Sequence, residues 1–423
     1  MHVEQRRFVS AALVLVAWSL GGPGAPGREP GGEVRLAVPV NGSPFQASLV
    51  AIAPDWKVTF DVGGTRRVLP ATDLVYWGTY RDRYRAGQIL LSNGSLLAAE
   101  VLGIGDDAVS LYGELWGRAQ IPLRFVQGMM LDPPADPAER DRLYELIVSG
   151  VGGEDRLILE NGDVIAGVVT GWREPPRSAP TGAPAIAITA EGRAVTMDVD
   201  RTAAVVFNPA LLEIPRKQSF RTLIGFRDGS LLVVENLEWD RGFLRFRLPG
   251  PIVLEAGAES IWRDVVLLQP FAGAVRYLSD MEPVGYRHVP LLDLAWPFER
   301  DRNVLGGRLR SGGSLYVKGL GMHSTSRLAY DLDGRYQRFQ AELAVDDRAG
   351  WGGSVVFRVF LPDASGEWKK AYESPIIRGG QDAVPMSVDI AGAQRMALIV
   401  DFAERGDVLD YADWLNARLV EQD

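Results

Sequence analysis

The sequence contains no cysteine, and this absence removes several classes of protein and site at once. Without a thiol there are no disulfides, no thiolate nucleophile, no cysteine-ligated zinc and no lipid-modified N-terminal cysteine. Histidine is scarce too: His2, His288 and His323 are the only three, which excludes a histidine-rich metal site. The 423 residues must therefore be held together by hydrophobic cores, and this length predicts two or more of them.

The chain has fewer basic than acidic residues: 45 Lys and Arg against 54 Asp and Glu, which gives a net charge of -9. Nucleic-acid surfaces need clustered basic side chains that displace counterions from phosphates, so we expect no nucleic-acid partner. No long hydrophobic run follows the first 30 residues, and we expect no membrane contact beyond that leader.

Residues 1–30 have the features of a targeting segment. Arg6 and Arg7 form a short positive region, and a mostly apolar run of thirteen residues follows at 8–20. A bilayer core takes roughly 20 residues to span, and the Gly- and Pro-rich stretch 21–30 would break a helix. We expect export to the periplasm or the exterior. No good A-x-A cleavage site is present, so an uncleaved N-terminal anchor stays open.

Four Asn-Gly or Asp-Gly pairs divide residues 31–271 into units of similar pattern. Each lies between apolar runs, and they are Asn41-Gly42, Asn93-Gly94, Asn161-Gly162 and Asp228-Gly229. Such pairs favour type I′ turns, in which both central residues have φ > 0, and they predict β-hairpins. Each unit also ends in a short apolar strand. The pattern predicts four copies of one five-stranded unit.

A five-stranded antiparallel unit of this size limits its exposed edges by rolling into an SH3-like or Sm-like barrel. We therefore expect two small barrels over 31–134 and two more over 151–271. Residues 135–150 form a helical connector, since Leu143, Leu146 and Ile147 lie at helical spacing within 137–148. Two other interpretations stay open: an irregular sandwich of paired units, and unrelated strands that share a turn.

Four motifs follow one another in the last third of the chain. They are Lys-Gly-Leu-Gly-Met-His-Ser at 318–324, a strand-like run ending in Val-Asp-Asp at 345–347, the glycine-flanked Val-Val-Phe-Arg-Val at 355–359, and Asp-Tyr-Ala-Asp-Trp at 410–414. In type, order and spacing they resemble the NPCBM family, a carbohydrate-binding module often appended to family 98 glycoside hydrolases. Tyr411 is a departure, because the family commonly has histidine there.

The resemblance implies a jelly-roll-like β-sandwich over 272–423 that binds glycans, galactose-type glycans among them, and has no catalysis of its own. The expected fold class is therefore all-β, with SH3-like or Sm-like barrels followed by this sandwich. The lead-in at 273–301 lacks the low complexity of a flexible linker, so we expect the two halves to be rigidly joined. A kink or bulge is expected in the last strand, between Trp414 and Leu419.

Eight residues in these motifs form the candidate sugar-binding set: His323, Asp346, Asp347, Trp351, Asp410, Tyr411, Asp413 and Trp414. Carboxylates accept hydrogen bonds from sugar hydroxyls, neutral imidazole both donates and accepts, and an aromatic ring covers the apolar face of a pyranose. Structural roles stay open beside these. Asp346 and Asp347 suit the capping of a turn, and His323 suits a contact to a loop. Lys318 is expected in solvent.

A regular strand over 410–414 would place Asp410 and Trp414 on one face and Asp413 on the other, so the three cannot line one pocket. A structural Ca²⁺ held by carboxylate and backbone oxygens stays open here, although EF-hand spacing is missing. No other cofactor is expected. Tyr411 offers no imidazole, but its ring can stack and its hydroxyl can donate.

Motifs for catalysis are missing: the chain has no Gly-x-Ser-x-Gly, no phosphate-binding glycine loop and no His-Glu-x-x-His. We therefore expect an exported, non-catalytic protein that recognises glycans. One alternative is an envelope scaffold that binds other envelope proteins and has lost sugar binding. Another is a hydrolase with two carboxylates in a deep pocket.

Overall fold

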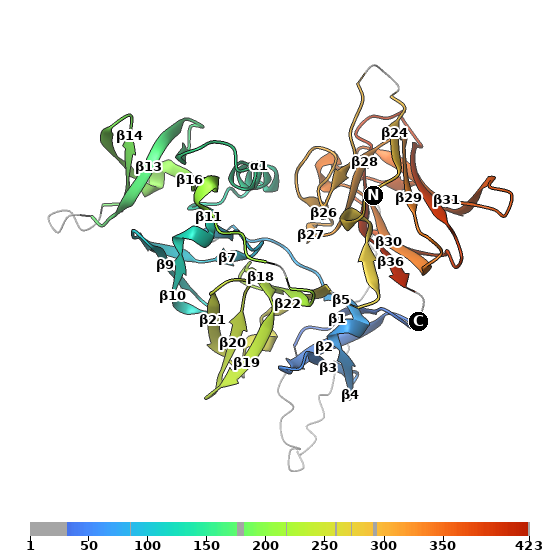
Figure 1. Ribbon diagram of the computed structural model, residues 1–423, viewed down its shortest axis with the longest axis horizontal. Helices are drawn as coiled ribbons and strands as arrows, with labels where there is room; N and C mark the ends of the chain where they lie inside the picture. The colour runs from blue at the N-terminus through green and yellow to red at the C-terminus, as the bar shows by residue number, and fades with distance from the viewer. Residues whose placement is uncertain are drawn as a thin grey trace, which may run out of the picture.

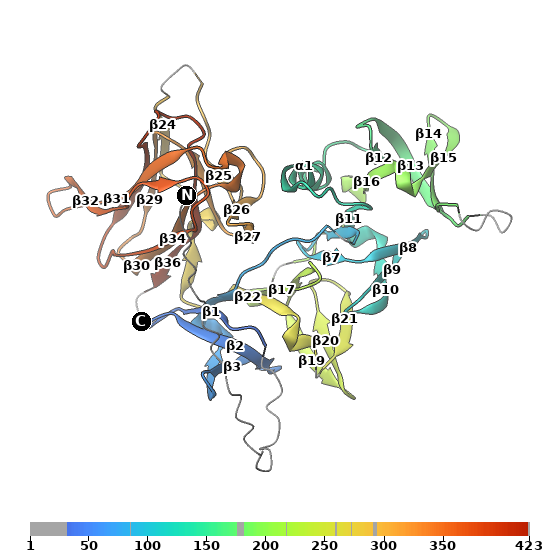
Figure 2. The same ribbon diagram turned by 180° about the vertical axis from the view of Figure 1, so that it is seen from behind.

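The computed structural model describes residues 32–84, 86–175, 182–216, 218–258, 260–271, 273–290 and 294–421. Repeated small β-units precede residue 272, and a β-sandwich follows it (Figures 1 and 2). The all-β prediction is confirmed, with a single α-helix in the described part of the chain. The leader predicted over 1–30 lies outside the described residues. No helix in the described part is long and apolar enough to cross a membrane.

The same order of strands, with a 3-10 helix before the last, occurs four times before residue 272. Unit 1 comprises β1 (Arg35–Pro39), β2 (Phe45–Ile52), β3 (Lys57–Val62), β4 (Thr65–Pro70), η1 (Ala71–Asp73) and β5 (Leu74–Gly78). Unit 2 comprises β6 (Gln88–Leu91), β7 (Leu96–Ala98), β8 (Glu100–Ile104), β9 (Ala108–Gly113), β10 (Gly117–Pro122), η2 (Leu123–Phe125) and β11 (Val126–Met130). In this unit the second strand is divided into β7 and β8.

Units 3 and 4 repeat this order. Unit 3 comprises β12 (Asp155–Leu159), β13 (Val164–Arg173), β14 (Ala185–Ala190), β15 (Arg193–Asp198), η3 (Val199–Arg201) and β16 (Thr202–Val206). After η4 (Pro209–Leu211), unit 4 comprises β17 (Arg221–Phe226), β18 (Leu231–Val234), β19 (Asn236–Asp240), β20 (Phe243–Arg247), β21 (Val253–Gly257), η5 (Ile261–Arg263) and β22 (Val265–Phe271). The second strand is again divided, here into β18 and β19.

Sixteen strands of the four units join edge to edge in one sheet, while β8–β10 of unit 2 and β19–β21 of unit 4 form two separate three-stranded sheets. Within each unit the first strand lies between the second and the fifth, as in the order β2-β1-β5. Between units, β16 pairs with β11, β7 with β18, and β22 with β5, so the spatial order is 3, 2, 4, 1. These pairings cover strand edges that would otherwise be exposed. Closure of each unit into a barrel stays a prediction.

The type I′ prediction for the hairpin turns is wrong. Gly94, Gly162 and Gly229 have φ of 90°, 86° and 103°, while the Asn or Asp before each is not among the residues with positive φ. Each glycine N–H donates to the carbonyl three residues earlier, for example Gly94 to Leu91 at 2.9 Å. The turn is therefore a three-residue loop that ends in a glycine bulge, a geometry in which only the glycine needs a positive φ.

The predicted helix is present as α1 (Pro137–Val148). Asp136 caps its N-terminus by accepting a hydrogen bond from the Ala138 N–H at 2.9 Å, and Pro137 occupies the first turn, where its missing N–H has no consequence. Ile147 is buried against Met130 and Val206, which belong to units 2 and 3. The helix therefore covers the junction of these two units.

Two sheets form the C-terminal sandwich. One has the order β25-β28-β36-β30-β34, with β23 also paired to β36; the other has the order β24-β29-β35-β31-β32, with β33 also paired to β31. Phe339, Phe357 and Trp414 meet between them in the core. The bounds are β23 (Val275–Tyr277), η6 (Leu278–Asp280), β24 (Gly285–His288), β25 (Glu299–Arg300), β26 (Leu309–Ser311), β27 (Ser314–Tyr316), β28 (Gly319–His323), β29 (Ser326–Asp331), β30 (Tyr336–Val345), η7 (Asp347–Ala349), β31 (Ser354–Pro362), β32 (Trp368–Glu373), β33 (Ile377–Arg378), β34 (Val384–Asp389), β35 (Arg395–Phe402) and β36 (Tyr411–Glu421).

The last strand has the predicted irregularity, because Asn416 has φ 46° and the pairing of β36 with β30 shifts register there. The expectation that Lys318 lies in solvent is wrong. Its ammonium donates to Asp280 at 2.6 Å and to Asp301 at 2.8 Å, and the residue is 9% exposed. These two carboxylates fix the start of the Lys-Gly-Leu-Gly-Met-His-Ser run.

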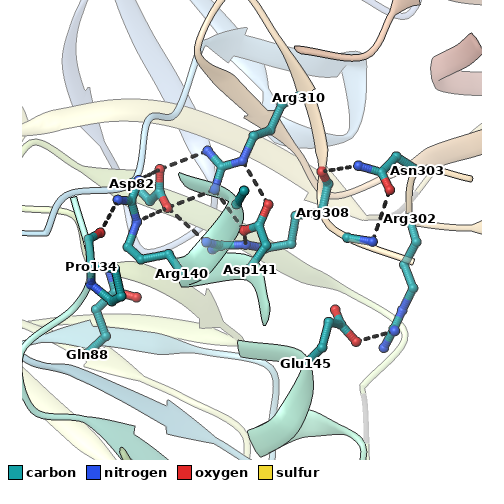
Figure 3. A network of polar contacts seen from close by, with 12 residues as sticks. Asp82, Gln88, Pro134, Arg140, Asp141, Glu145, Arg302, Asn303, Arg308 and Arg310 are labelled. Carbon is teal, nitrogen blue, oxygen red and sulfur yellow. Dashed lines mark hydrogen bonds and ion pairs between the residues drawn. The ribbon is translucent and has the colours of Figure 1, made fainter. Parts of the chain in front are cut away.

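A buried ionic network connects the N-terminal units to the sandwich (Figure 3). Asp82 and Asp141, from the N-terminal part, accept from Arg308 and Arg310 of the sandwich at 2.6–3.0 Å, and Arg140 donates to Asp82 at 2.9 Å. Burial opposes the charge on Asp82, but the three guanidinium groups more than compensate and lower its pKa. With Tyr80 also bridged to Leu315 through the backbone, the two halves are in close contact. Their rigid connection stays a prediction.

Candidate functional site

Loops at one end of the sandwich hold most of the predicted site residues. Here β28 ends at His323, which pairs with Tyr411 at the start of β36, and β31 begins next to them at Ser354. We call this end of the sandwich the rim and define it by residues 294–298, 323–325, 346–353 and 403–411. Strand pairing brings these four segments together although more than a hundred residues separate the first from the last.

Trp351 is the most exposed aromatic side chain of the rim, at 87%. It follows η7, and its ring lies on the backbone of Gly380: a Cβ atom at that glycine would lie 2.7 Å from Trp351 Cε3. Gly380 has φ 75°, a conformation that side chains rarely adopt. The glycine therefore supports one face of the indole, and the exposed area belongs to the rest of the ring.

His323 lies in a cluster of aromatic rings at the other side of the rim. Its ring stacks on Trp296, with ring centroids 4.9 Å apart and an interplanar angle of 4°. The ring centroids of His288 and Tyr411 lie 5.8 and 6.0 Å from that of His323. His323 Nδ1 lies 2.7 Å from the Ser324 carbonyl, so this nitrogen carries the proton and Nε2 is left as an acceptor. Burial lowers the pKa of His323, which favours the neutral ring.

Asp410 connects the two sides of the rim. Its carboxyl group accepts from the Ser324 hydroxyl at 2.6 Å and from the Ser354 N–H at 2.8 Å, and the residue is 0% exposed. Burial raises the pKa of Asp410 to about 6, against the two hydrogen bonds that lower it. Asp410 therefore holds the loop after His323 next to the start of β31.

Asp410→Asn is expected to make the protein less sensitive to pH. Because the folded state raises the pKa of Asp410 to about 6, the protonated group favours folding, and this contribution is lost as pH rises through 6. Relative to wild type, the variant should gain about 1 kcal/mol in free energy of unfolding between pH 5 and pH 8. Urea unfolding at both pH values measures this. Asp333→Asn, at a side chain 68% exposed, is the control, and an equal Asp410→Asn effect at both pH values would contradict the account.

Asp346 and Asp347 have the turn roles that were left open. Asp346 is 0% exposed and accepts from the Arg348 N–H at 2.9 Å, the Arg310 N–H at 3.0 Å and the Asn303 amide at 3.2 Å. Asp347 accepts from the N–H groups of Gly312 and Gly313, in the turn between β26 and β27, at 2.9 and 2.8 Å. Both carboxylates thus fix the loop that carries Trp351.

Asp413 and Trp414 are not on the rim surface, since both are 0% exposed. Burial raises the pKa of Asp413 well above its ordinary value, and the carboxyl of Asp346 raises it further. Neither carboxyl oxygen of Asp413 accepts a hydrogen bond from an N–H or O–H group of the residues that the structure describes. A neutral Asp413 can instead donate its own proton to Asp346, and this hydrogen bond lowers the cost of burying the carboxyl group. Trp414 packs edge-on against Phe357, with centroids 4.8 Å apart, and belongs to the core.

Comparison with known proteins identifies this part of the chain. Residues 274–420 match the model of the NPCBM/NEW2 domain. The C-terminal third is an NPCBM/NEW2 domain. This match confirms the resemblance to the NPCBM family that the four sequence motifs indicated. The rim described above belongs to this domain.

Two relatives match part of the chain. A protein of Renibacterium salmoninarum provisionally named endo-alpha-N-acetylgalactosaminidase is 31% identical over 151 residues, which is 34% of this chain and 9% of that protein. Alpha-1,3-galactosidase B of Akkermansia muciniphila is 30% identical over 120 residues, 27% of this chain and 14% of that enzyme. The chain therefore spans only a small part of these relatives.

A solved structure is also similar to part of the chain. It is a CBM51 module from a Clostridium perfringens GH95 protein in complex with methyl-galactose, 24% identical, covering 34% of this chain and 99% of that module with a TM-score of 0.30. Such a low TM-score is no basis for assigning the ligand or the site of this chain.

Two residues of the NPCBM/NEW2 domain near His323 were not among the predicted site residues: Trp296, which lies in the rim, and His288, at the end of β24. Trp296 donates its backbone N–H to His288 Nδ1 at 3.1 Å, and its carbonyl accepts from the Tyr286 hydroxyl at 2.7 Å, so the stacked ring is held in place. His288 Nε2 and His323 Nδ1 share the Ser324 carbonyl as acceptor. The scarcity of histidine was a usable signal, because two of the three histidines meet here.

Metal binding was left open for the carboxylates of the NPCBM/NEW2 domain. Over the residues that the structure describes, no group of three or more His, Cys, Asp or Glu side chains is arranged to hold a metal ion. The donors of Asp346 and Asp410 are instead N–H and O–H groups of the protein.

Proposed function

We propose that this protein is exported and binds galactose-type glycans, without catalysis, through the rim of its NPCBM/NEW2 domain. The observation that carries the proposal is the Trp351 ring, which is 87% exposed and lies on the Gly380 backbone. A flat, fixed indole can cover the apolar C–H face of a pyranose at a low cost in side-chain entropy. Tryptophan is otherwise costly to expose, since it forgoes a large hydrophobic contribution.

The second group of contacts in the proposal is the cluster of Trp296, His323 and Tyr411. In the proposal His323, although only 4% exposed, accepts from a sugar hydroxyl through Nε2, and the centroid of the half-buried Tyr411 ring lies 6.0 Å from that of the imidazole. Asp410 connects this cluster to the loop of Trp351 through Ser324 and Ser354. The proposal therefore assigns Asp346, Asp347, Asp410 and Asp413 to positioning the rim, and only Trp351, His323 and Tyr411 to sugar contact.

The non-catalytic part of the proposal rests on what the buried carboxylates do. A glycosidase needs two carboxyl groups that face the glycosidic bond. Asp346 and Asp410 are fully buried and accept hydrogen bonds from the protein, and Asp413 is directed to Asp346. The sugar preference rests on the names of the two relatives, both of which refer to galactose-type sugars.

A glycan array probed with the full chain tests the proposal. Open rims on β-sandwiches bind single sugars weakly, so the glycans are displayed at high density to add avidity. We expect binding to glycans with terminal galactose or N-acetylgalactosamine, and none to glycans that lack galactose-type sugars. An array without any bound glycan would contradict the proposal and favour the envelope-scaffold alternative.

A further inference from the structure

A cleft of about 640 Å³ opens between helix α1 and the NPCBM/NEW2 domain, directly beside the rim. One wall is the helix, with Glu139, Arg142 and Glu145, and the other is the loop before β26, with Arg302. Arg348 completes the lining and lies three residues before Trp351 in the same loop. The cleft is thus built from both halves of the chain, and Arg348 connects it to the loop that carries the exposed indole.

The lining of this cleft carries three arginines and three carboxylates, in a protein whose net charge is -9. Asp141 belongs both to this lining and to the buried network drawn in Figure 3. Cleft and network together hold six arginines and four acidic side chains: Arg140, Arg142, Arg302, Arg308, Arg310 and Arg348 with Asp82, Glu139, Asp141 and Glu145. Two positive charges are left uncompensated.

Two of the three acidic side chains that line the cleft form ion pairs with arginines. Asp141 accepts from Arg308 and Arg310, and Glu145 forms an ion pair with Arg302. Arg142 and Arg348 are exposed and form no ion pair with any residue that the structure describes, and Glu139 is the one carboxylate of the lining without an arginine partner there. Two guanidinium groups therefore stand free, one on each wall.

We propose that this cleft binds the anionic group of an acidic glycan, with Arg142 and Arg348 as its contacts, while the neutral part of the glycan lies on Trp351. The inference rests on the proposed function, and names the ligand class of that same site. A guanidinium presents its N–H groups in a planar fork that matches two oxygens of a carboxylate or a sulfate ester. A glycan that ends in a uronic acid and one that carries a sulfate both supply this chemistry.

Three matched probes test the inference with the full chain: albumin conjugates of galactose, galacturonic acid and galactose 6-sulfate at equal sugar density. Biolayer interferometry gives their dissociation constants. We expect at least one anionic conjugate to bind about tenfold more tightly than the galactose conjugate at low salt, with the difference shrinking at high salt. The two anionic arms separate carboxylate from sulfate recognition.

The double variant Arg142→Ala/Arg348→Ala is expected to abolish this preference for the anionic conjugates. Its control, Arg241→Ala/Arg335→Ala, removes the same charge at side chains 93% and 64% exposed elsewhere and should retain the preference. The inference is wrong if the galactose conjugate binds and neither anionic conjugate binds more tightly. It is also wrong if both double variants lose the preference equally. In either case the proposed function stands. If no conjugate binds, both are wrong.

Discussion

Replacing Asp82 with alanine is expected to lower the free energy of unfolding by about 3–5 kcal/mol. The Asp82 side chain is 3% exposed and accepts from Arg140, Arg308 and Arg310. Its removal leaves three buried guanidinium groups with Asp141 as the only carboxylate of the network, and an uncompensated buried charge is strongly destabilising. Urea unfolding followed by tryptophan fluorescence measures the change.

The matched control for Asp82 is Asp333→Ala, which removes a carboxylate that is 68% exposed and pairs with Arg335 at 3.3 Å. Exposed ion pairs contribute little, so this variant should change the free energy by less than about 1 kcal/mol. Equal effects of the two substitutions would mean that the network does not hold the N-terminal units against the NPCBM/NEW2 domain.

Trp351→Ala is expected to weaken binding to a galactose-type glycan roughly thirtyfold, the effect of losing a central aromatic contact of about 2 kcal/mol. The variant should fold normally, because the side chain is 87% exposed and only its supported face packs on Gly380. Surface plasmon resonance on an immobilised galactose-terminated glycan gives the affinity, and circular dichroism checks the fold.

Trp368→Ala is the control for Trp351→Ala. Trp368 is also exposed, at 43%, but it pairs with Pro362 at the far end of β31, whereas Trp351 precedes the start of that strand. The whole length of a nine-residue strand separates the two positions. The control should bind like wild type, and a comparable loss in both variants would show that general aromatic exposure, not the rim, governs binding.

Local patterns predicted much of the fold. The helical spacing of Leu143, Leu146 and Ile147 indicated α1, and the four motifs of the C-terminal third indicated a β-sandwich. The Asn-Gly and Asp-Gly pairs indicated hairpins but not their turn type. Both turn types place glycine at a positive φ, and they differ in the residue before it, where Asn and Asp tolerate either conformation.

Burial within the site could not be predicted, because it depends on partners distant in sequence. Asp413 looked like a ligand residue, yet β36 is central in its sheet and directs this carboxyl to Asp346. Arg310 and Asp82 are 228 residues apart and meet only through the packing of the two halves. By contrast, Trp351 lies between Gly350 and Gly352, and this local glycine-rich pattern was enough to indicate a loop.

The indole signals of the tryptophans in a ¹⁵N-labelled sample, followed by NMR during titration with methyl galactoside, test the central claim most directly. We predict that the Trp351 signal shifts in a saturable manner, with a smaller shift at Trp296, while Trp368 and the buried Trp414 stay unchanged. A saturable shift at Trp368 without one at Trp351 would contradict the assignment of sugar binding to the rim.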